Sequence, residues 1–218
     1  MPTAPSPSSA PMRLVRTITD VEEGAAWLAV AEPRFAHALS LTGRPPLRRR
    51  RDGFAALRDA IISQQVSVAA ARAIRARCVA AGATSPRAVR RLDDATLRAC
   101  GLSRQKVRYL RALAEARIDF AGLRAAPTDE VVATLIQVDG IGRWTAEIYA
   151  LFSLGHADVL APADLALQES ARLLFDLPAR PTERALRAMA EPWAPWRSVA
   201  ARLLWSYYHV AKAREGTL

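Results

Sequence analysis

Two glycines separated by one isoleucine, Gly140-Ile141-Gly142, constrain this chain of 218 residues more than any other feature. Apolar residues recur at helical spacing on both sides, over residues 128–136 and 144–155. The pattern predicts a helix, a tight glycine turn and a second helix. The start of the second helix should present unpaired backbone N–H groups and the positive end of the helix dipole, which together can bind a phosphate oxygen.

The rest of the chain predicts an all-α fold. From Thr19 onward nearly every segment has helical spacing, and sustained alternation typical of strands is missing. We expect one helical domain of two lobes with a cleft between them over residues 19–218, after a disordered leader of residues 1–18. Helix starts are predicted at residues that commonly cap helices. These are Asp20 (with Glu23), Ser85, Asp93 or Asp94, Ser103, Thr128 and Thr182.

Three polar stretches accompany these helices. The sequence Ser63-Gln64-Gln65 interrupts an apolar helical face and is typical of a junction between two helices. The linker of residues 43–53 holds four consecutive arginines, 48–51, which either track phosphates or form a solvated charge run. A helix from Ser103, predicted to end near Phe120, carries four basic residues that we expect to face solvent: Lys106, Arg108, Arg111 and Arg117.

The charge balance indicates a polyanionic partner. The net charge is +10 and the isoelectric point about 10.8, values that fit nucleic acid, a membrane surface or a merely solvated basic surface. No segment approaches the ~20 uninterrupted apolar residues of a membrane span. Two cysteines, Cys78 and Cys100, are too few for a four-ligand zinc or iron–sulfur site and favour a reducing, cytoplasmic setting.

Four segments resemble segments of the helix–hairpin–helix DNA glycosylases and follow one another in the same order as in that family. Within the family they resemble the DNA-3-methyladenine glycosylase II branch. They are residues 62–67, 138–146, 162–164 and 195–198 leading to Trp205. The resemblance covers about residues 20–212. It implies an enzyme of base excision repair, nucleoid-associated and monomeric, that acts on double-stranded DNA containing alkylated bases. Relatives of one subtype carry an extra N-terminal β domain, but the residues before Phe54 are too few and too helical for it, so we expect the compact form of the fold.

The resemblance assigns the chemistry to Asp164, 20 residues after Trp144. Breaking an N-glycosidic bond passes through a sugar that resembles an oxocarbenium ion, so a negative charge near C1′ and an activated water are needed. An N-alkylated purine is already cationic and leaves as a neutral base, so a second carboxylic acid is unnecessary. By position alone Asp164 is more typical of a helix N-cap.

The pocket and the absence of strand cleavage are also implied by the resemblance. Trp144 and Trp205 fall on positions that line the base pocket and could hold a cationic base by stacking and cation–π attraction. Relatives can carry tyrosine where this chain has Ile148 and Leu165. Relatives that cleave the strand place a lysine immediately after the hairpin, where this chain has Trp144. A monofunctional glycosylase without lyase activity or iron–sulfur cluster is therefore expected.

Further DNA contacts come from the same resemblance. The N–H groups of Gly140 and Gly142, assisted by Thr145, would bind a phosphate, and Gln65 would fill the gap left by a flipped base. Asp139 replaces the usual first hairpin proline. The nearby carbonyls would hold Na⁺ or K⁺; they belong to Ile136, Val138 and Ile141.

Three functions remain open at this point. The first is excision of alkylated purines such as 3-methyladenine and 7-methylguanine. The second is excision of neutral lesions such as hypoxanthine or ethenoadenine, and the third is a helix–hairpin–helix module that binds DNA without chemistry. Asp164 and the two tryptophans favour an enzyme.

Overall fold

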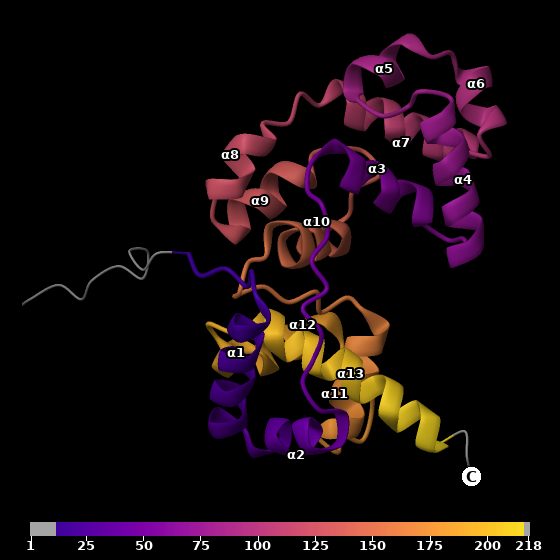
Figure 1. Cartoon of the computed structure of the whole chain (residues 1–218). Helices are drawn as coiled ribbons and strands as arrows, with labels where there is room; N and C mark the ends of the chain where they lie inside the picture. Colours follow the sequence, from indigo (N-terminus) through magenta and orange to yellow (C-terminus); the bar gives the residue numbers. More distant parts are fainter. Residues whose placement is uncertain (1–11, 216–218) are drawn as a thin grey trace, which may run out of the picture.

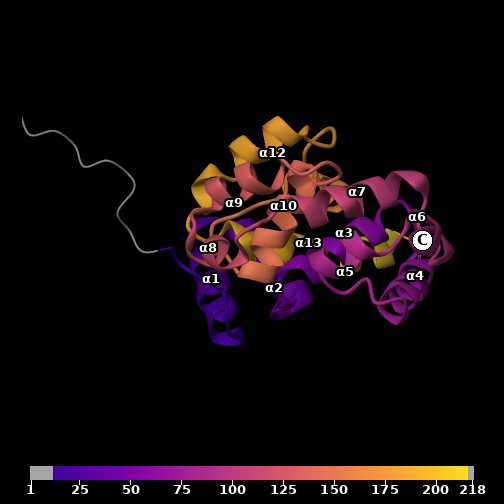
Figure 2. The same ribbon diagram turned by 90° about the horizontal axis from the view of Figure 1, so that it is seen from above.

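A computed structural model describes residues 12–215 and places their helices in two stacked groups (Figure 1). The first group is central in the sequence: α3 (Phe54–Ser63), α4 (Val68–Ala80), α5 (Pro86–Arg91), α6 (Asp94–Ala99), α7 (Arg104–Glu115), α8 (Phe120–Ala125), α9 (Thr128–Leu135), α10 (Arg143–Tyr149) and the π-helical turn η1 (Ala150–Leu154). The second group joins the two ends of the chain: α1 (Ile18–Ala31), α2 (Pro33–Thr42), α11 (Leu165–Leu174), α12 (Glu183–Met189), the 3-10 turn η2 (Glu191–Trp193) and α13 (Arg197–Glu215). The two groups overlap when seen from above (Figure 2), so the molecule is two-lobed along the vertical axis of Figure 1.

The all-α prediction is confirmed for the part of the chain that the structure describes. The β-structure within residues 12–215 is limited to one isolated bridge between Leu14 and His156. None of the helices in this range is long and apolar enough to cross a membrane.

Side-chain caps explain most of the helix starts. The hydroxyls of Ser85, Ser103 and Thr182 accept backbone N–H groups at the starts of α5, α7 and α12, as predicted. Two predicted starts are wrong. The capping box of α1 pairs Thr17 with Asp20, and α9 begins after Pro127 with Thr128 already inside the helix.

The predicted leader is too long at its C-terminal end. Residues 1–11 lie outside the described part of the chain, but Val15 is fully buried and its N–H donates to the carbonyl of Gly155 at 2.7 Å. The carbonyl of Arg13 accepts from Ala157 at 3.0 Å. These contacts join segments about 140 residues apart, which is why local sequence composition did not reveal them.

The helix expected from Ser103 to Phe120 is also wrong in two ways. It ends at Glu115, and residues 120–125 form the separate helix α8. Lys106 does not face solvent: it is 9% exposed, and its ammonium donates to the carbonyl of Ile62 at 2.7 Å. Arg111 likewise turns inward and donates to the carbonyls of Val89 and Leu92. Free carbonyl groups at the ends of neighbouring helices attract these cations.

The arginine-rich linker runs between the two lobes. Its backbone N–H at Arg50 donates to the carbonyl of Phe152 in η1 at 2.9 Å, and the Arg50 guanidinium lies 5.1 Å from the ring centroid of Phe152. Arg202 of α13 is 1% exposed and donates to the carbonyls of Leu47 and Leu151. Burial lowers the pKa of Arg202 to about 10. Linker, η1 and α13 are therefore fixed together at the junction of the lobes.

Candidate functional site: a carboxylate between two tryptophans

The glycine turn links α9 to α10 as predicted. Gly140 has φ of +90°, and a Cβ atom placed there would lie 2.2 Å from Cγ of Tyr109, so only glycine fits. Gly142 is the N-cap of α10, without a side-chain cap, and a Cβ there would meet nothing within 4 Å. The first N–H groups of α10 are thus not covered by a capping side chain. Asp139, in place of the usual proline, forms an ion pair with Arg108 at 2.9 Å.

The predicted contributions of Thr145 and of the three carbonyls remain predictions. Thr145 is 6% exposed and lies in the first turn of α10, where backbone N–H groups have no partner within the helix. The carbonyl of Val138 accepts the N–H of Ile141 at 2.9 Å. A carbonyl oxygen has two lone pairs, so this bond leaves Val138 able to accept a second interaction.

Asp164 sits where the two lobes meet and has two sets of partners. As the N-cap of α11, its Oδ1 accepts the backbone N–H groups of Ala166 at 3.0 Å and Leu167 at 3.1 Å. The indole of Trp205 also donates to Oδ1 at 3.1 Å, and the indole of Trp144 donates to Oδ2 at 3.1 Å. Trp144 comes from α10 and Trp205 from α13. The structure therefore brings together the three residues predicted for catalysis and the base pocket.

Trp205, one of the two indoles bound to Asp164, packs against an aromatic ring that two arginines contact. The ring of Trp205 stacks on Phe152 at 5.4 Å with an interplanar angle of 26°. The guanidinium groups of Arg50 and Arg202 lie 5.1 and 5.2 Å from the Phe152 ring centroid. Helical spacing over residues 144–155 did not reveal this contact of Phe152, because nothing in a helical pattern shows which ring a distant tryptophan will stack on.

The other side of the site is open. Trp144 is 43% exposed and Leu165 is 63% exposed, whereas Ile148 packs against the hydrophobic core. A hollow beginning at Leu165 continues between α11 and α13 and is lined further on by Glu169, Arg180 and Tyr208. Ile148 and Leu165 therefore contribute apolar rather than aromatic surface on this side of the site.

Glu147 is a second carboxylate near the hairpin, and it was missed from the sequence. It is 2% exposed and pairs with Arg187 of α12 at 2.9 Å and Arg143 at 3.7 Å. Burial raises the pKa of Glu147, and its arginine partners oppose that rise. This ion pair holds α10 against α12, whereas Asp164 is the carboxylate beside the exposed tryptophan.

The junction between α3 and α4 faces the hairpin. Gln65 is exposed and has φ of +53°, a left-handed conformation that costs a non-glycine residue about 1 kcal/mol or more. Gln64, beside it, donates from Nε2 to the carbonyl of Gly140 at 2.9 Å. The predicted helix junction is confirmed, and the contact of Gln64 was not foreseen.

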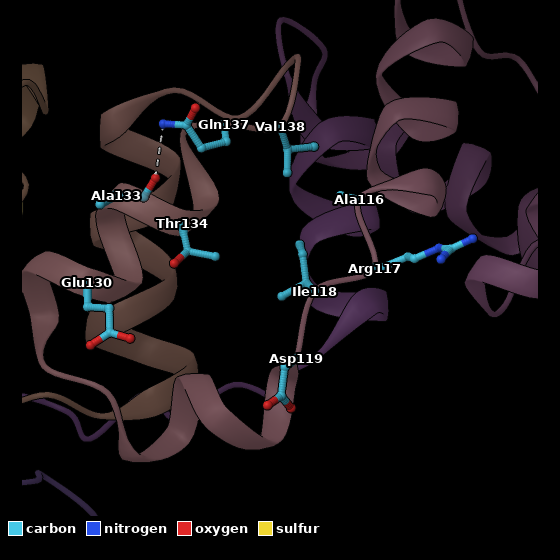
Figure 3. Close-up of a pocket in the computed structure, with 9 residues that line it drawn as sticks. All are labelled: Ala116, Arg117, Ile118, Asp119, Glu130, Ala133, Thr134, Gln137 and Val138. Atoms are coloured by element: carbon cyan, nitrogen blue, oxygen red, sulfur yellow. Dashed lines mark hydrogen bonds between the residues drawn. The ribbon is translucent and has the colours of Figure 1, made fainter.

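A separate hollow lies between α9 and the segment joining α7 to α8 (Figure 3). It is lined by residues 116–119 and by residues of α9 and the following turn, among them Glu130 and Gln137. Neither Asp164 nor the two tryptophans line it. It is therefore distinct from the site at the junction of the lobes.

Comparison with known proteins agrees with this geometry. Residues 59–195 match the family described as HhH-GPD superfamily base excision DNA repair protein. DNA-3-methyladenine glycosylase 1 of Schizosaccharomyces pombe is 34% identical over 167 residues, which cover 72% of this chain and 72% of the relative. DNA-3-methyladenine glycosylase 2 of Escherichia coli is 31% identical over 67% of this chain and 54% of its own length.

Solved structures show the same arrangement of helices. A DNA-3-methyladenine glycosidase of Bacillus halodurans superposes with a TM-score of 0.80 at 30% identity, covering 87% of this chain and 91% of that one. The 3-methyladenine DNA glycosylase of Schizosaccharomyces pombe, in complex with abasic DNA, gives a TM-score of 0.72 at 31% identity, with coverages of 84% and 95%. The hairpin, the carboxylate and the matched segment of 137 residues lead to one conclusion: this chain belongs to the HhH-GPD superfamily of base excision DNA repair proteins.

Proposed function

We propose that this protein is a monofunctional DNA glycosylase that hydrolyses the N-glycosidic bond of alkylated purines such as 3-methyladenine and 7-methylguanine. The observation that carries the proposal is the Asp164 carboxylate, which is held by the indoles of Trp144 and Trp205 at the junction of the lobes. Relatives named DNA-3-methyladenine glycosylases, one of them with a solved complex with abasic DNA, support it.

Asp164 would act after the damaged nucleotide has been flipped from the duplex. The bond between C1′ and the purine nitrogen breaks, and its electron pair leaves with the base, which becomes neutral. The carboxylate stabilises the positive sugar that remains, in a position fixed beforehand by four N–H donors. Water then adds to C1′ and gives its proton to Asp164.

The tryptophans would select the base. Trp144 offers an exposed aromatic face, and Trp205 is supported from behind by Phe152. Such faces attract a cationic purine through the ring quadrupole. Ile148 and Leu165 add only apolar surface, so neutral lesions such as hypoxanthine or ethenoadenine are the second candidate substrates.

The hairpin would fix the DNA next to the lesion. The N–H groups of Gly140, Gly142 and Thr145 would bind one phosphate, and Gln65 would occupy the gap left by the flipped nucleotide. The carbonyls of Ile136, Val138 and Ile141 are hard oxygen donors of the kind that suit Na⁺ or K⁺, and a cation there would offset the charge of the phosphate.

Hydrolysis without strand cleavage is supported by the residue that follows the hairpin, which is neither Lys106 nor Lys212, although Lys212 does line the hollow that begins at Leu165. Lys106 lies in α7 with its ammonium committed to the carbonyl of Ile62, and burial lowers its pKa. Lys212 lies on α13 and is 3.9 Å from Glu169. The position after the hairpin is Trp144, which cannot form a Schiff base.

We propose a monomeric enzyme, cytoplasmic and associated with the nucleoid.

The proposal is tested by chromatography of the bases released from methylated DNA and from oligonucleotides containing hypoxanthine or ethenoadenine. We expect 3-methyladenine and 7-methylguanine to be released, and strands to break only after alkali treatment. Release of the neutral lesions alone would move the function to the second class of substrate. DNA binding without release of any base would leave a non-catalytic DNA-binding protein.

A further inference from the structure

The α3–α4 junction and the hairpin are joined by one side chain. Nε2 of Gln64 donates to the carbonyl oxygen of Gly140 at 2.9 Å, between residues 76 apart in the sequence. Because a carbonyl can only accept, the amide group of Gln64 must present its nitrogen to Gly140. Gln64 is half-buried, while Gln65 beside it is exposed.

At the hairpin end of this contact, residues of α7 pack against the turn. The ring of Tyr109 lies directly under Gly140, where no Cβ could be accommodated. The neighbouring Asp139 pairs with Arg108, again from α7, at 2.9 Å. The carbonyl that Gln64 binds is thus in a turn that cannot shift without disturbing α7.

The junction end is fixed by the same helix. The ammonium of Lys106 donates to the carbonyl of Ile62 at 2.7 Å, in the last turn of α3. A cation at the C-terminus of a helix is favoured by the free carbonyl groups and by the dipole. About one turn of α7, residues 106–109, therefore supports both Ile62 before the junction and the residues of the hairpin, and Gln64 links the two.

The backbone at Gln65 needs such support. Its φ of +53° is a conformation that a non-glycine residue keeps only where the surroundings hold it. The preceding residue, Gln64, ties this backbone to the hairpin through its hydrogen bond.

We propose that Gln64 is a positioning residue, which couples the side chain presented to the DNA gap, Gln65, to the hairpin that anchors the phosphate. This inference rests on the proposed function, since the gap arises when a nucleotide is flipped. Gln64 itself need not touch the DNA. Its amide sets the distance and direction between the two groups that do.

The test is a double-mutant cycle of Gln64→Met and Gln65→Ala. Methionine keeps the length of the side chain and removes the donor. The probe is a duplex with a tetrahydrofuran abasic site beside 2-aminopurine, so that both affinity and entry of a side chain into the stack are measured without base release. Gln137→Met is the matched control, because the amide of Gln137 donates to the carbonyl of Ala133, four residues earlier in the chain (Figure 3).

We expect Gln64→Met to weaken binding to the abasic duplex about fivefold, as the loss of one such hydrogen bond implies, and to reduce the 2-aminopurine signal. Binding to undamaged duplex should change less than about twofold, the melting temperature should stay near that of the wild type, and Gln137→Met should have no effect. With Gln65→Ala already present, Gln64→Met should cost nothing more.

Equal effects of Gln64→Met in both backgrounds would overturn the coupling and leave a local structural role. A Gln64→Met variant that binds and inserts as the wild type does would overturn it as well, as would a Gln65→Ala variant without effect. A protein that releases no base but shows the expected cycle would contradict the proposed catalysis while keeping this inference.

Discussion

Replacing Asp164 by asparagine separates the two roles of this side chain. Asparagine keeps one oxygen, which can still accept the N–H groups of Ala166 and Leu167 at the start of α11. Asparagine is among the best N-cap residues, so the free energy of unfolding should change by no more than about 0.5 kcal/mol. If Asp164 were only a helix cap, the substitution would therefore have little effect.

The catalytic role should respond very differently. The NH₂ group of asparagine takes the place of Oδ2 and faces the indole N–H of Trp144, which donates to that oxygen at 3.1 Å. The negative charge next to the sugar is lost at the same time. Removing one preorganised group that stabilises transition-state charge costs about 3–4 kcal/mol, or a factor of 10²–10³. We expect the excision rate of Asp164→Asn to fall at least about 100-fold.

The assay is single-turnover release of 7-methylguanine, alongside urea unfolding of the same preparations. Thr182→Ala is the control, because Thr182 caps α12 in the same way by accepting from Ala185 at 3.2 Å. That variant should lose about 1 kcal/mol of stability and keep its excision rate. An Asp164→Asn variant that excises within about tenfold of the wild type would refute the reasoning, since the electrostatic contribution would then be too small.

Three further outcomes are expected. Trp205→Phe removes the indole donor to Asp164 at 3.1 Å and should slow excision about tenfold, the value of a hydrogen bond to a charged group, with little change in unfolding; a rate within twofold of the wild type contradicts this. Gly140→Ala, at φ of +90° and against an aromatic ring, should lose at least about 2 kcal/mol in urea unfolding and weaken DNA binding, whereas Gly142→Ala meets nothing within 4 Å and should fold normally. Burial lowers the pKa of His156 to about 4, so the unfolded chain binds more protons between that value and about 6.5. The free energy of unfolding should therefore decrease as the pH is lowered through this window, by about 2 kcal/mol at pH 5 relative to pH 7.5. The His156→Gln variant should lack this component.

Local sequence was sufficient for three helix starts that depend on one residue, but not for α1, where Thr17 rather than Asp20 is the cap. Ser85, Ser103 and Thr182 cap the helices they precede, because a hydroxyl reaches the N–H three residues on whatever the rest of the chain does. The turn at Gly140 was equally readable. Where a start depends on a distant partner, prediction failed: the hydroxyl of Thr128 lies 2.8 Å from Nδ1 of His156 instead of capping α9.

Only part of the candidate site could be predicted from the sequence, and there is a physical reason why the rest could not. Sequence by itself determined the helical class and the glycine turn, since periodicity and φ preference are properties of the chain, and its resemblance to a family singled out Trp144, Asp164 and Trp205 as predicted site residues. Only the tertiary structure decided that both indoles donate to one carboxylate, that Phe152 supports Trp205, that Lys106 is buried against α3 and that Gln64 binds the hairpin. Each of these is a contact between segments far apart in the sequence, and its distance and direction are set by how the helices pack rather than by any local preference.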